Sequence, residues 1–316
     1  MAADGAFPLL LDVDTGVDDA LALALAVSSP EAHLVGVTTL AGNVPVEAAT
    51  ENTLRVLGWC GADGVPVFRG ASRPLVAEYR SATHVHGDNG LGGAELPAAS
   101  RDAEQQPGPG ALIRLAEEYA GELVVVALGP LTNLAIALNV RPELPRLIRR
   151  LIVMGGAYEV PGNVTPVAEF NIFVDPHAAN FVFEAPWPSL VAVGLDVTHQ
   201  AALSRRTWEA IPDGATGAPG LVRHTLQHTF TGRDKTGMYL HDPLAVAVAL
   251  NPTFVETVGK RVIVETEGEF RGRTTAIGDG DIGVAISVRA DDFSRWFGER
   301  LALPPGDPKE ALRRAD

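Results

Sequence analysis

The chain has 316 residues, of which 46% are hydrophobic and 20% are charged, and its formal net charge at pH 7 is -14. A largely disordered chain is excluded, because these proportions are those of folded globular proteins. The acidic balance also disfavours nucleic acid as a partner, since binding to phosphate backbones needs clustered Lys and Arg side chains.

Cysteine content and apolar runs indicate the cellular setting. Cys60 is the only cysteine, so an internal disulfide, a redox pair and a cysteine-based zinc site are excluded. The sequence shows no basic segment followed by a long apolar one near residue 1, and no run of about eighteen apolar residues. We therefore expect a soluble, cytoplasmic protein without a membrane partner. Because no low-complexity linker divides the sequence, we expect one domain over residues 1–316.

Four aspartates crowd into the first predicted unit, a buried strand over residues 9–13 that a turn joins to a helix from residue 17. They are Asp12, Asp14, Asp18 and Asp19. Because side chains alternate along a strand, Asp12 and Asp14 share one direction. So much negative charge repels itself unless a cation neutralises it, which predicts a bound metal ion. The simpler alternative is a helix cap at Asp19 and a hydrogen-bonded core carboxylate at Asp12.

Two metal-dependent motifs can be compared with this unit. An EF-hand loop needs an oxygen ligand at its fifth position, Gly at its sixth and Glu at its twelfth. Counting from Asp12, these positions hold Gly16, Val17 and Leu23, so an EF-hand is excluded. Phosphatases of the haloacid dehalogenase type also begin with a strand that ends in Asp-x-Asp, followed by Thr or Val. This similarity keeps open a metal-dependent phosphohydrolase, with Asp12 as the nucleophile and Asp14 as the acid.

Strand-like and helix-like segments alternate farther along the chain. Strand-like runs at 33–43, 65–70, 123–130, 150–158 and 189–197 are separated by helix-like runs at 46–59, 111–120, 131–139 and 177–185. This alternation predicts an α/β fold with a mainly parallel, open, Rossmann-like sheet flanked by helices. Strand-like runs joined by turns within residues 260–288 predict a small C-terminal β extension. Because ligands bind at the carboxyl ends of such strands, Asp14, Asn43 and Asp196 indicate where a site lies.

Two later segments carry further polar residues. In YLHDPLAVAVAL, the proline after Asp242 makes this residue a natural N-cap, whereas His241 has no such capping role. In GNVTPVAEFNIFVDP, Asn163, Glu169 and Asn171 supply the donors and acceptors that a polyhydroxyl ligand needs. Each signal is modest alone, since a lone His is more often structural and Asn and Glu are ordinary loop residues.

In combination these segments resemble a known family. DVDTGVDDALAL, TTLAGN, LIVMGGAY, the GN-to-EFN arrangement and YLHDPLAVA occur in the same order and at similar spacing in the inosine-uridine-preferring nucleoside hydrolases. The resemblance runs from Leu9 to about Leu301. It implies a calcium-dependent enzyme that hydrolyses the N-glycosidic bond of ribonucleosides to ribose and free base, in nucleoside salvage and catabolism. It also implies a homodimer or a homotetramer.

The resemblance further implies roles for individual residues. Asp14 would be the general base for the attacking water, and His241 would protonate the leaving base. Calcium would be held by an all-oxygen set, which suits this ion, made of the side chains of Asp14, Asp19 and Asp242 and the backbone carbonyl of Leu128. The nucleoside would be bound by Asp18, Asn43, His86, Met154, Asn163, Glu169 and Asn171.

Base preference does not follow from the resemblance. Many relatives have tyrosines that approach the base where this chain has Thr225 and Thr229, so the segment 224–239 gives no preference. His84 and His86 lie in a Gly-rich loop that either contributes the second histidine to the site or only closes over the substrate.

Two alternatives to the hydrolase make different predictions. The phosphohydrolase needs a lysine near the site, and Lys235 is the only lysine before Val258. A non-catalytic, calcium-dependent binder of nucleoside or ribose would use the same ligand residues as the hydrolase. Only His241 favours catalysis over such binding.

Overall fold

An eight-stranded sheet forms the centre of the computed structural model, which describes residues 5–306. Its strands are β1 (Phe7–Val13), β2 (Ala32–Thr39), β3 (Val67–Arg69), β4 (Leu123–Ala127), β5 (Ile148–Met154), β6 (Leu190–Val193), β9 (Val255–Val264) and β10 (Thr274–Val288). Their order is β3-β2-β1-β4-β5-β6-β10-β9, and all neighbours are parallel except β10 and β9. The predicted mainly parallel sheet is confirmed. A second sheet pairs β7 (Ala202–Ser204) with β8 (Gly237–Tyr239).

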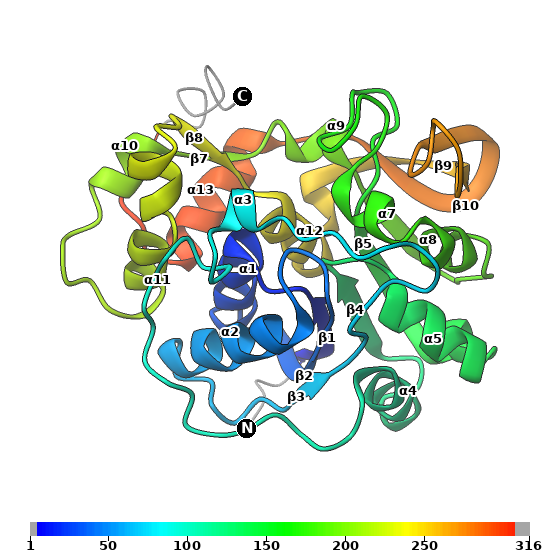
Figure 1. Ribbon diagram of the computed structural model, residues 1–316, viewed down its shortest axis with the longest axis horizontal. Helices are drawn as coiled ribbons and strands as arrows, with labels where there is room; N and C mark the ends of the chain where they lie inside the picture. Colours follow the sequence, from blue (N-terminus) through cyan, green and yellow to red (C-terminus); the bar gives the residue numbers. More distant parts are fainter. Residues whose placement is uncertain (1–4, 307–316) are drawn as a thin grey trace.

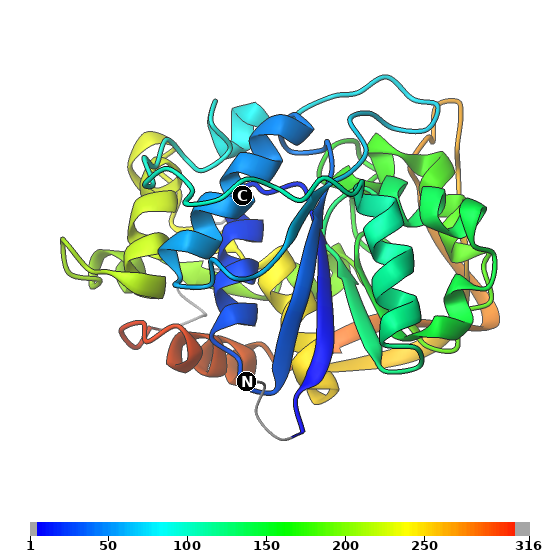
Figure 2. The same cartoon turned by 90° about the horizontal axis from the view of Figure 1, so that it is seen from below.

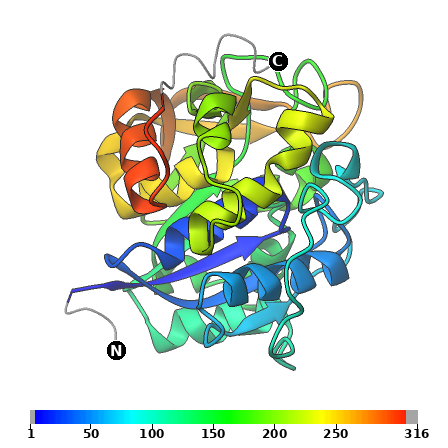
Figure 3. The same ribbon diagram turned by 90° about the vertical axis from the view of Figure 1, so that its left-hand side faces the viewer.

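Helices cover both faces of the large sheet. They are α1 (Val17–Val27), α2 (Val46–Trp59), α3 (Thr83–His86), α4 (Gly108–Glu118), α5 (Thr132–Val140), α6 (Leu144–Leu147), α7 (Phe170–Val174), α8 (Pro176–Phe183), α9 (Leu195–Thr198), α10 (Arg205–Glu209), α11 (Gly217–Thr225), α12 (His241–Leu250) and α13 (Ala290–Arg300), with a π-helix η1 (His228–Gly232) and a 3-10 helix η2 (Pro252–Phe254). One face is covered by α1, α2, α11, α12 and α13, and the other by α4, α5 and α8 (Figures 1 and 2). Figure 3 shows α13 in red, and this helix packs against α12.

The burial of β1 explains why an uninterrupted apolar run is needed there. Leu9, Leu11 and Val13 pack with α1 and α12 on one face, whereas Leu10 packs with α4 and α5 on the other. All four side chains are fully buried. Because helices cover both faces of a parallel sheet, neither face of its central strands can be polar.

The C-terminal β extension differs in detail from the prediction. Two of its strand-like runs form one strand, β10, which pairs with β9 on both sides of a bulge between Ile277 and Ile282. The glycines and aspartates between these two residues leave the ladder, and Gly278 adopts a positive φ of 50°. These four residues therefore form a turn-like bulge inside β10. On its other side, β10 joins the large sheet by pairing parallel with β6.

Within residues 5–306, no helix is both long and apolar enough to span a membrane.

The parallel strands determine where the site lies. The strands β1, β2, β4, β5 and β6 place their carboxyl ends at one edge of the sheet, where ligands bind in folds of this kind.

Candidate active site

A hollow of about 730 Å³ opens at the carboxyl edge of the parallel strands. Most of the predicted site residues line it: Asp18, Asn43, His86, Leu128, Met154, Asn163, Glu169, Asn171, His241 and Asp242. Asp14 and Asp19 do not line it and are fully buried, but both accept hydrogen bonds from Asn43, which does line it. The structure therefore brings the residues that the family resemblance assigns to the site into one region. Asp196 does not line the hollow, and its carboxylate accepts hydrogen bonds from the backbone N–H groups of Tyr158 and Glu159.

Three buried carboxylates converge beside this hollow. Asp18, Asp19 and Asp242 each offer one oxygen, and these oxygens lie within 4.8 Å of one another. The Oδ1 atom of Asp18 is buried and has no hydrogen-bond partner in the described part of the chain. Converging oxygen donors, one of them without a partner, fit a hard divalent cation such as Ca²⁺ or Mg²⁺.

Asp14 is held rigidly next to this cluster. The backbone N–H of Asn43 donates to its Oδ2 atom at 2.6 Å, and the Asn43 side-chain amide donates to Oδ1 at 3.1 Å. Gly42 and Gly129 leave space for the carboxylate, because a Cβ atom at Gly42 would lie 2.0 Å from Oδ2. Asp14 thus has one orientation available, and a side chain at position 42 would displace it.

The pKa values of the acidic groups reflect their crowding. Burial, followed by the charge of Asp19, raises the pKa of Asp14 well above 3.8. The pKa of Asp242 is also raised well above 3.8, by burial and by the charges of Asp18, Asp19 and Asp14. The pKa of Asp19 is raised to about 7 by burial and by the charge of Asp18. Crowding and burial therefore favour the protonated form of these carboxyl groups, and a bound cation would favour the charged form.

Asp12 lies outside the site. Its Oδ1 atom accepts hydrogen bonds from the Thr38 hydroxyl at 2.6 Å and from the Asn133 amide at 2.8 Å. Asn133 also donates to the backbone carbonyl of Thr39. Burial raises the pKa of Asp12 to about 6. The residue connects β1, β2 and α5 beneath the site, as a hydrogen-bonded core carboxylate.

The loop that begins at Gly162 and the start of α7, as far as Asn171, form one side of the hollow. Glu169 caps α7 by accepting from the backbone N–H groups of Asn171 and Ile172, and it also accepts from Gly156. The Asn171 amide donates to the carbonyls of Leu128 at 2.7 Å and of Met154 at 3.1 Å. These bonds fix the carboxylate and the amide on rigid elements at the ends of β4 and β5.

His86 reaches the site from α3. Its Nδ1 atom accepts the Val17 backbone N–H at 3.0 Å and lies 3.8 Å from Oδ1 of Asp18. Burial lowers the pKa of His86 to about 4. A neutral ring that accepts at Nδ1 carries its proton on Nε2, so His86 can act as a hydrogen-bond donor in the hollow. His84 also lines the hollow but is exposed.

His241 begins α12 and lies among aromatic rings. Its Nδ1 atom is 2.7 Å from the Thr198 hydroxyl. The Tyr239 ring lies 5.6 Å away and the His199 ring 5.7 Å away, centroid to centroid, and both line the hollow. Burial lowers the pKa of His241 to about 4, and the charge of Asp18 opposes this effect.

The segment that leads to His241 has irregular backbone. It comprises the end of α11, η1 and β8, and Asp234 between the last two has a positive φ of 52°. Thr225 is buried with its hydroxyl bonded to the Leu221 carbonyl, whereas Thr229 lines the hollow. Lys235 also lines it, as the phosphohydrolase alternative requires.

The sequence analysis assigns no role to His199 or Tyr239. The signal that could have identified them is positional, since Tyr239 begins the YLHDPLAVA motif two residues before His241, and His199 lies just beyond the predicted strand over residues 189–197.

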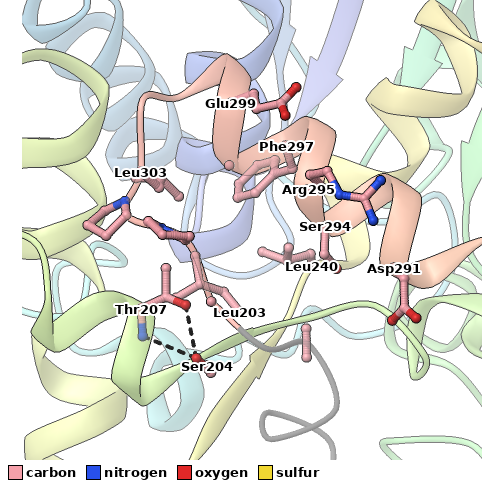
Figure 4. Close-up of a pocket in the computed structure, with 15 residues that line it drawn as sticks. Leu203, Ser204, Thr207, Leu240, Asp291, Ser294, Arg295, Phe297, Glu299 and Leu303 are labelled. Carbon is pink, nitrogen blue, oxygen red and sulfur yellow. Dashed lines mark hydrogen bonds between the residues drawn. The ribbon is translucent and has the colours of Figure 1, made fainter.

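A second hollow, of about 750 Å³, contains none of the predicted site residues. It lies between β7 and α13, where Leu240 faces Phe297 (Figure 4). Its polar wall includes Ser204 and Thr207, whose hydroxyls bond to each other at 2.9 Å. Asp291, Arg295 and Glu299 also line this second hollow, but its lining includes no histidine and none of the three converging carboxylates found at the first hollow.

Fold and site together define an α/β protein whose acidic small-molecule pocket lies at the carboxyl edge of a parallel sheet. Residues 9–295 match the inosine-uridine preferring nucleoside hydrolases, and the chain belongs to this family. It is 39% identical over 305 residues to the non-specific ribonucleoside hydrolase RihC of Salmonella enteritidis, covering 94% of this chain and 98% of that protein.

Solved structures agree with this assignment. A plant nucleoside hydrolase superimposes with a TM-score of 0.89 at 31% identity, over 94% of this chain and 99% of that one. The purine-preferring ribonucleoside hydrolase from Gardnerella vaginalis gives a TM-score of 0.87 at 34% identity, over 96% and 99% of the two chains. The prediction of a nucleoside hydrolase is confirmed, and neither the phosphohydrolase nor the non-catalytic binder is favoured.

Proposed function

We propose that this enzyme is a calcium-dependent hydrolase of purine and pyrimidine ribonucleosides that releases ribose and free base. The observation that carries the proposal is the convergence of buried Asp18, Asp19 and Asp242 oxygens beside a hollow that also contains Asn171, Glu169 and His241. The similarity to a relative named as non-specific supports a broad base range.

The side chains around the hollow suit the demands of N-glycosidic cleavage. As the bond breaks, positive charge develops on the ribosyl ring. Carboxylates fixed around the sugar stabilise this charge more in the transition state than in the ground state. Asp18, Glu169 and the amides of Asn43, Asn163 and Asn171 are assigned to the sugar.

Of the three converging carboxylates, Asp19 and Asp242 are assigned to calcium, together with Asp14 and the carbonyl of Leu128, whereas Asp18 is assigned to the sugar hydroxyls beside the ion. The carbonyl accepts one hydrogen bond from Asn171, and a second lone pair remains available. A calcium ion bound there would make water easier to deprotonate.

Proton transfers are assigned to two residues. Asp14, oriented by Asn43, takes a proton from the attacking water, which adds to the anomeric carbon. The electron pair of the broken C–N bond passes to the base, and His241 donates a proton to it. The negative charge that develops on the base favours the protonated form of His241 at that moment.

Product analysis with metal depletion tests the proposal. We expect purified protein to release ribose and free base from inosine and uridine, and a chelator to lower the rate by about a hundredfold or more. Added Ca²⁺ should restore activity better than Mg²⁺. Phosphate release from phosphomonoesters would support the phosphohydrolase, and nucleoside binding without ribose release would support the non-catalytic binder.

The pH dependence of stability provides a test of the cation site that does not depend on activity. The folded-state pKa of Asp19 is about 7, compared with 3.8 normally, so between these pH values the folded chain holds a proton that the unfolded chain has lost. Without metal, stability therefore falls as pH rises through this range. Calcium should raise the Tm by on the order of 5 °C more at pH 8 than at pH 5, measured by scanning calorimetry. A larger increase at pH 5 would contradict the site.

We also propose a cytoplasmic homodimer or homotetramer. Exposed apolar side chains at the edge formed by β9 and β10, namely Val258, Ile277 and Ile286, would suit such an interface. Light scattering on the purified enzyme measures its mass directly.

A further inference from the structure

The hydroxyl of Thr198 is directed at the imidazole of His241. The two polar atoms, Thr198 Oγ1 and His241 Nδ1, are 2.7 Å apart. Thr198 is fully buried, so its hydroxyl cannot use bulk water as a partner. A buried hydroxyl in this position must form its hydrogen bonds within the protein.

Thr198 is supported by a rigid part of the fold. It ends α9, which follows β6 directly, and its backbone N–H donates to the Gly194 carbonyl at 3.1 Å. Leu195 and Val197 of the same helix are fully buried, and α9 packs against α12, which begins with His241. The oxygen that contacts the imidazole is therefore fixed relative to the helix that carries the histidine.

The contact with Thr198 determines which ring nitrogen of His241 can face the substrate. The two ring nitrogens of histidine lie on different sides of the ring, so an Nδ1 atom bonded to buried Thr198 leaves Nε2 for the hollow. The rings of Tyr239 and His199 limit rotation further. A hydroxyl can accept from Nδ1–H while Nε2 transfers its proton, so the ring need not turn during the reaction.

We infer that Thr198 is a positioning residue that holds Nε2 of His241 toward the base of the bound nucleoside. The inference rests on the proposed acid role of His241. During the reaction the Nε2 proton passes to a nitrogen of the base, which takes the electron pair of the C–N bond, and the proton on Nδ1 remains bonded to Thr198. A purely structural threonine would instead only fill space between α9 and α12.

Substitution by valine separates these two roles, because valine keeps the shape of threonine and lacks the hydroxyl. We expect Thr198→Val to lower kcat for inosine and uridine by about tenfold or more, with KM changed by less than about threefold. Hydrolysis of 4-nitrophenyl β-D-ribofuranoside, whose leaving group needs no protonation, should stay within about threefold of wild type. Thr198→Ser, which keeps the hydroxyl, should restore most of the nucleoside activity.

A matched control is available at Thr207. This threonine is also buried and hydrogen-bonded, to Ser204 in the second hollow, and Thr207→Val should leave both activities unchanged. If Thr198→Val does not fold, Thr198→Ala and Thr198→Ser make the same comparison, since both lack the methyl group and only serine has the hydroxyl. The alanine variant should then show the selective loss and the serine variant should not.

The double variant distinguishes failure of this inference from failure of the proposed function. If Thr198 acts through His241, Thr198→Val should add no further loss on nucleosides in a His241→Ala background. Wild-type turnover by Thr198→Val, equal losses on both kinds of substrate, or fully additive losses in the double variant would overturn the inference. If His241→Ala lowers kcat equally for nucleosides and for the nitrophenyl riboside, the acid role of His241 itself is overturned.

Discussion

Replacing Asp14 with Asn should abolish hydrolysis of nucleosides and of 4-nitrophenyl β-D-ribofuranoside alike, with losses on the order of a thousandfold or more. An amide cannot accept the proton of the attacking water, whatever the leaving group. It also fits this environment badly, because Asn43 directs N–H groups at both carboxylate oxygens, and an amide NH₂ would face one of them. Initial rates with both substrates measure the effect.

Asp12→Asn is the matched control for this variant. The Oδ1 atom of Asp12 accepts both of its hydrogen bonds, whereas Oδ2 has no partner in the described structure and can be replaced by NH₂. Most of the activity should survive in Asp12→Asn. A folded Asp14→Asn variant that retains substantial activity would remove Asp14 from the base role. Loss of activity in Asp12→Asn with normal folding would instead revive the mechanism in which Asp12 is the nucleophile.

Replacing His241 with Ala should lower turnover of natural nucleosides by on the order of a hundredfold or more. The free bases are poor leaving groups and need a proton as the C–N bond breaks. The nitrophenyl leaving group does not, so its hydrolysis should change little. The measurement is the ratio of kcat for a natural nucleoside to kcat for 4-nitrophenyl β-D-ribofuranoside in each variant.

His33→Ala is a suitable control, because His33 is exposed in β2, at the end of the strand away from the site. It should behave as wild type with both substrates. Comparable losses on both substrates in His241→Ala would indicate that this histidine binds substrate or supports the fold, and would argue against proton donation.

The sheet and the acidic half of the site could be predicted because their signals are local. Apolar runs such as Leu9–Val13 identify strands covered on both faces, and parallel strands bring their carboxyl ends to one edge. Asp14, Asp18 and Asp19 are neighbours in sequence, so their crowding is visible without a structure. Asp242 and Glu169 gave only modest signals on their own, and the resemblance to a family was needed to place them in the same site, since local sequence does not determine where α12 and α7 lie in the fold.

The part of the pocket around His241 was less predictable because it depends on irregular backbone. Between α11 and His241 the chain passes through a π-helix and a residue with positive φ before β8, and no side-chain periodicity signals this path. Tyr239 and His199 meet His241 only because β7 and β8 pair. Contacts of this kind form between segments that are distant in sequence, where hydrophobic pattern carries no information about register.

The convergence of Asp19 and Asp242 also has a consequence for folding kinetics. Asp19 lies in the first turn of α1 and Asp242 in the first turn of α12, two helices from opposite parts of the chain that pack together. A cation held by both would close a loop containing most of the polypeptide, and such closure follows the formation of nearer contacts. Interactions that form late slow unfolding more than they speed folding. The cation site would therefore act mainly on the lifetime of the folded enzyme.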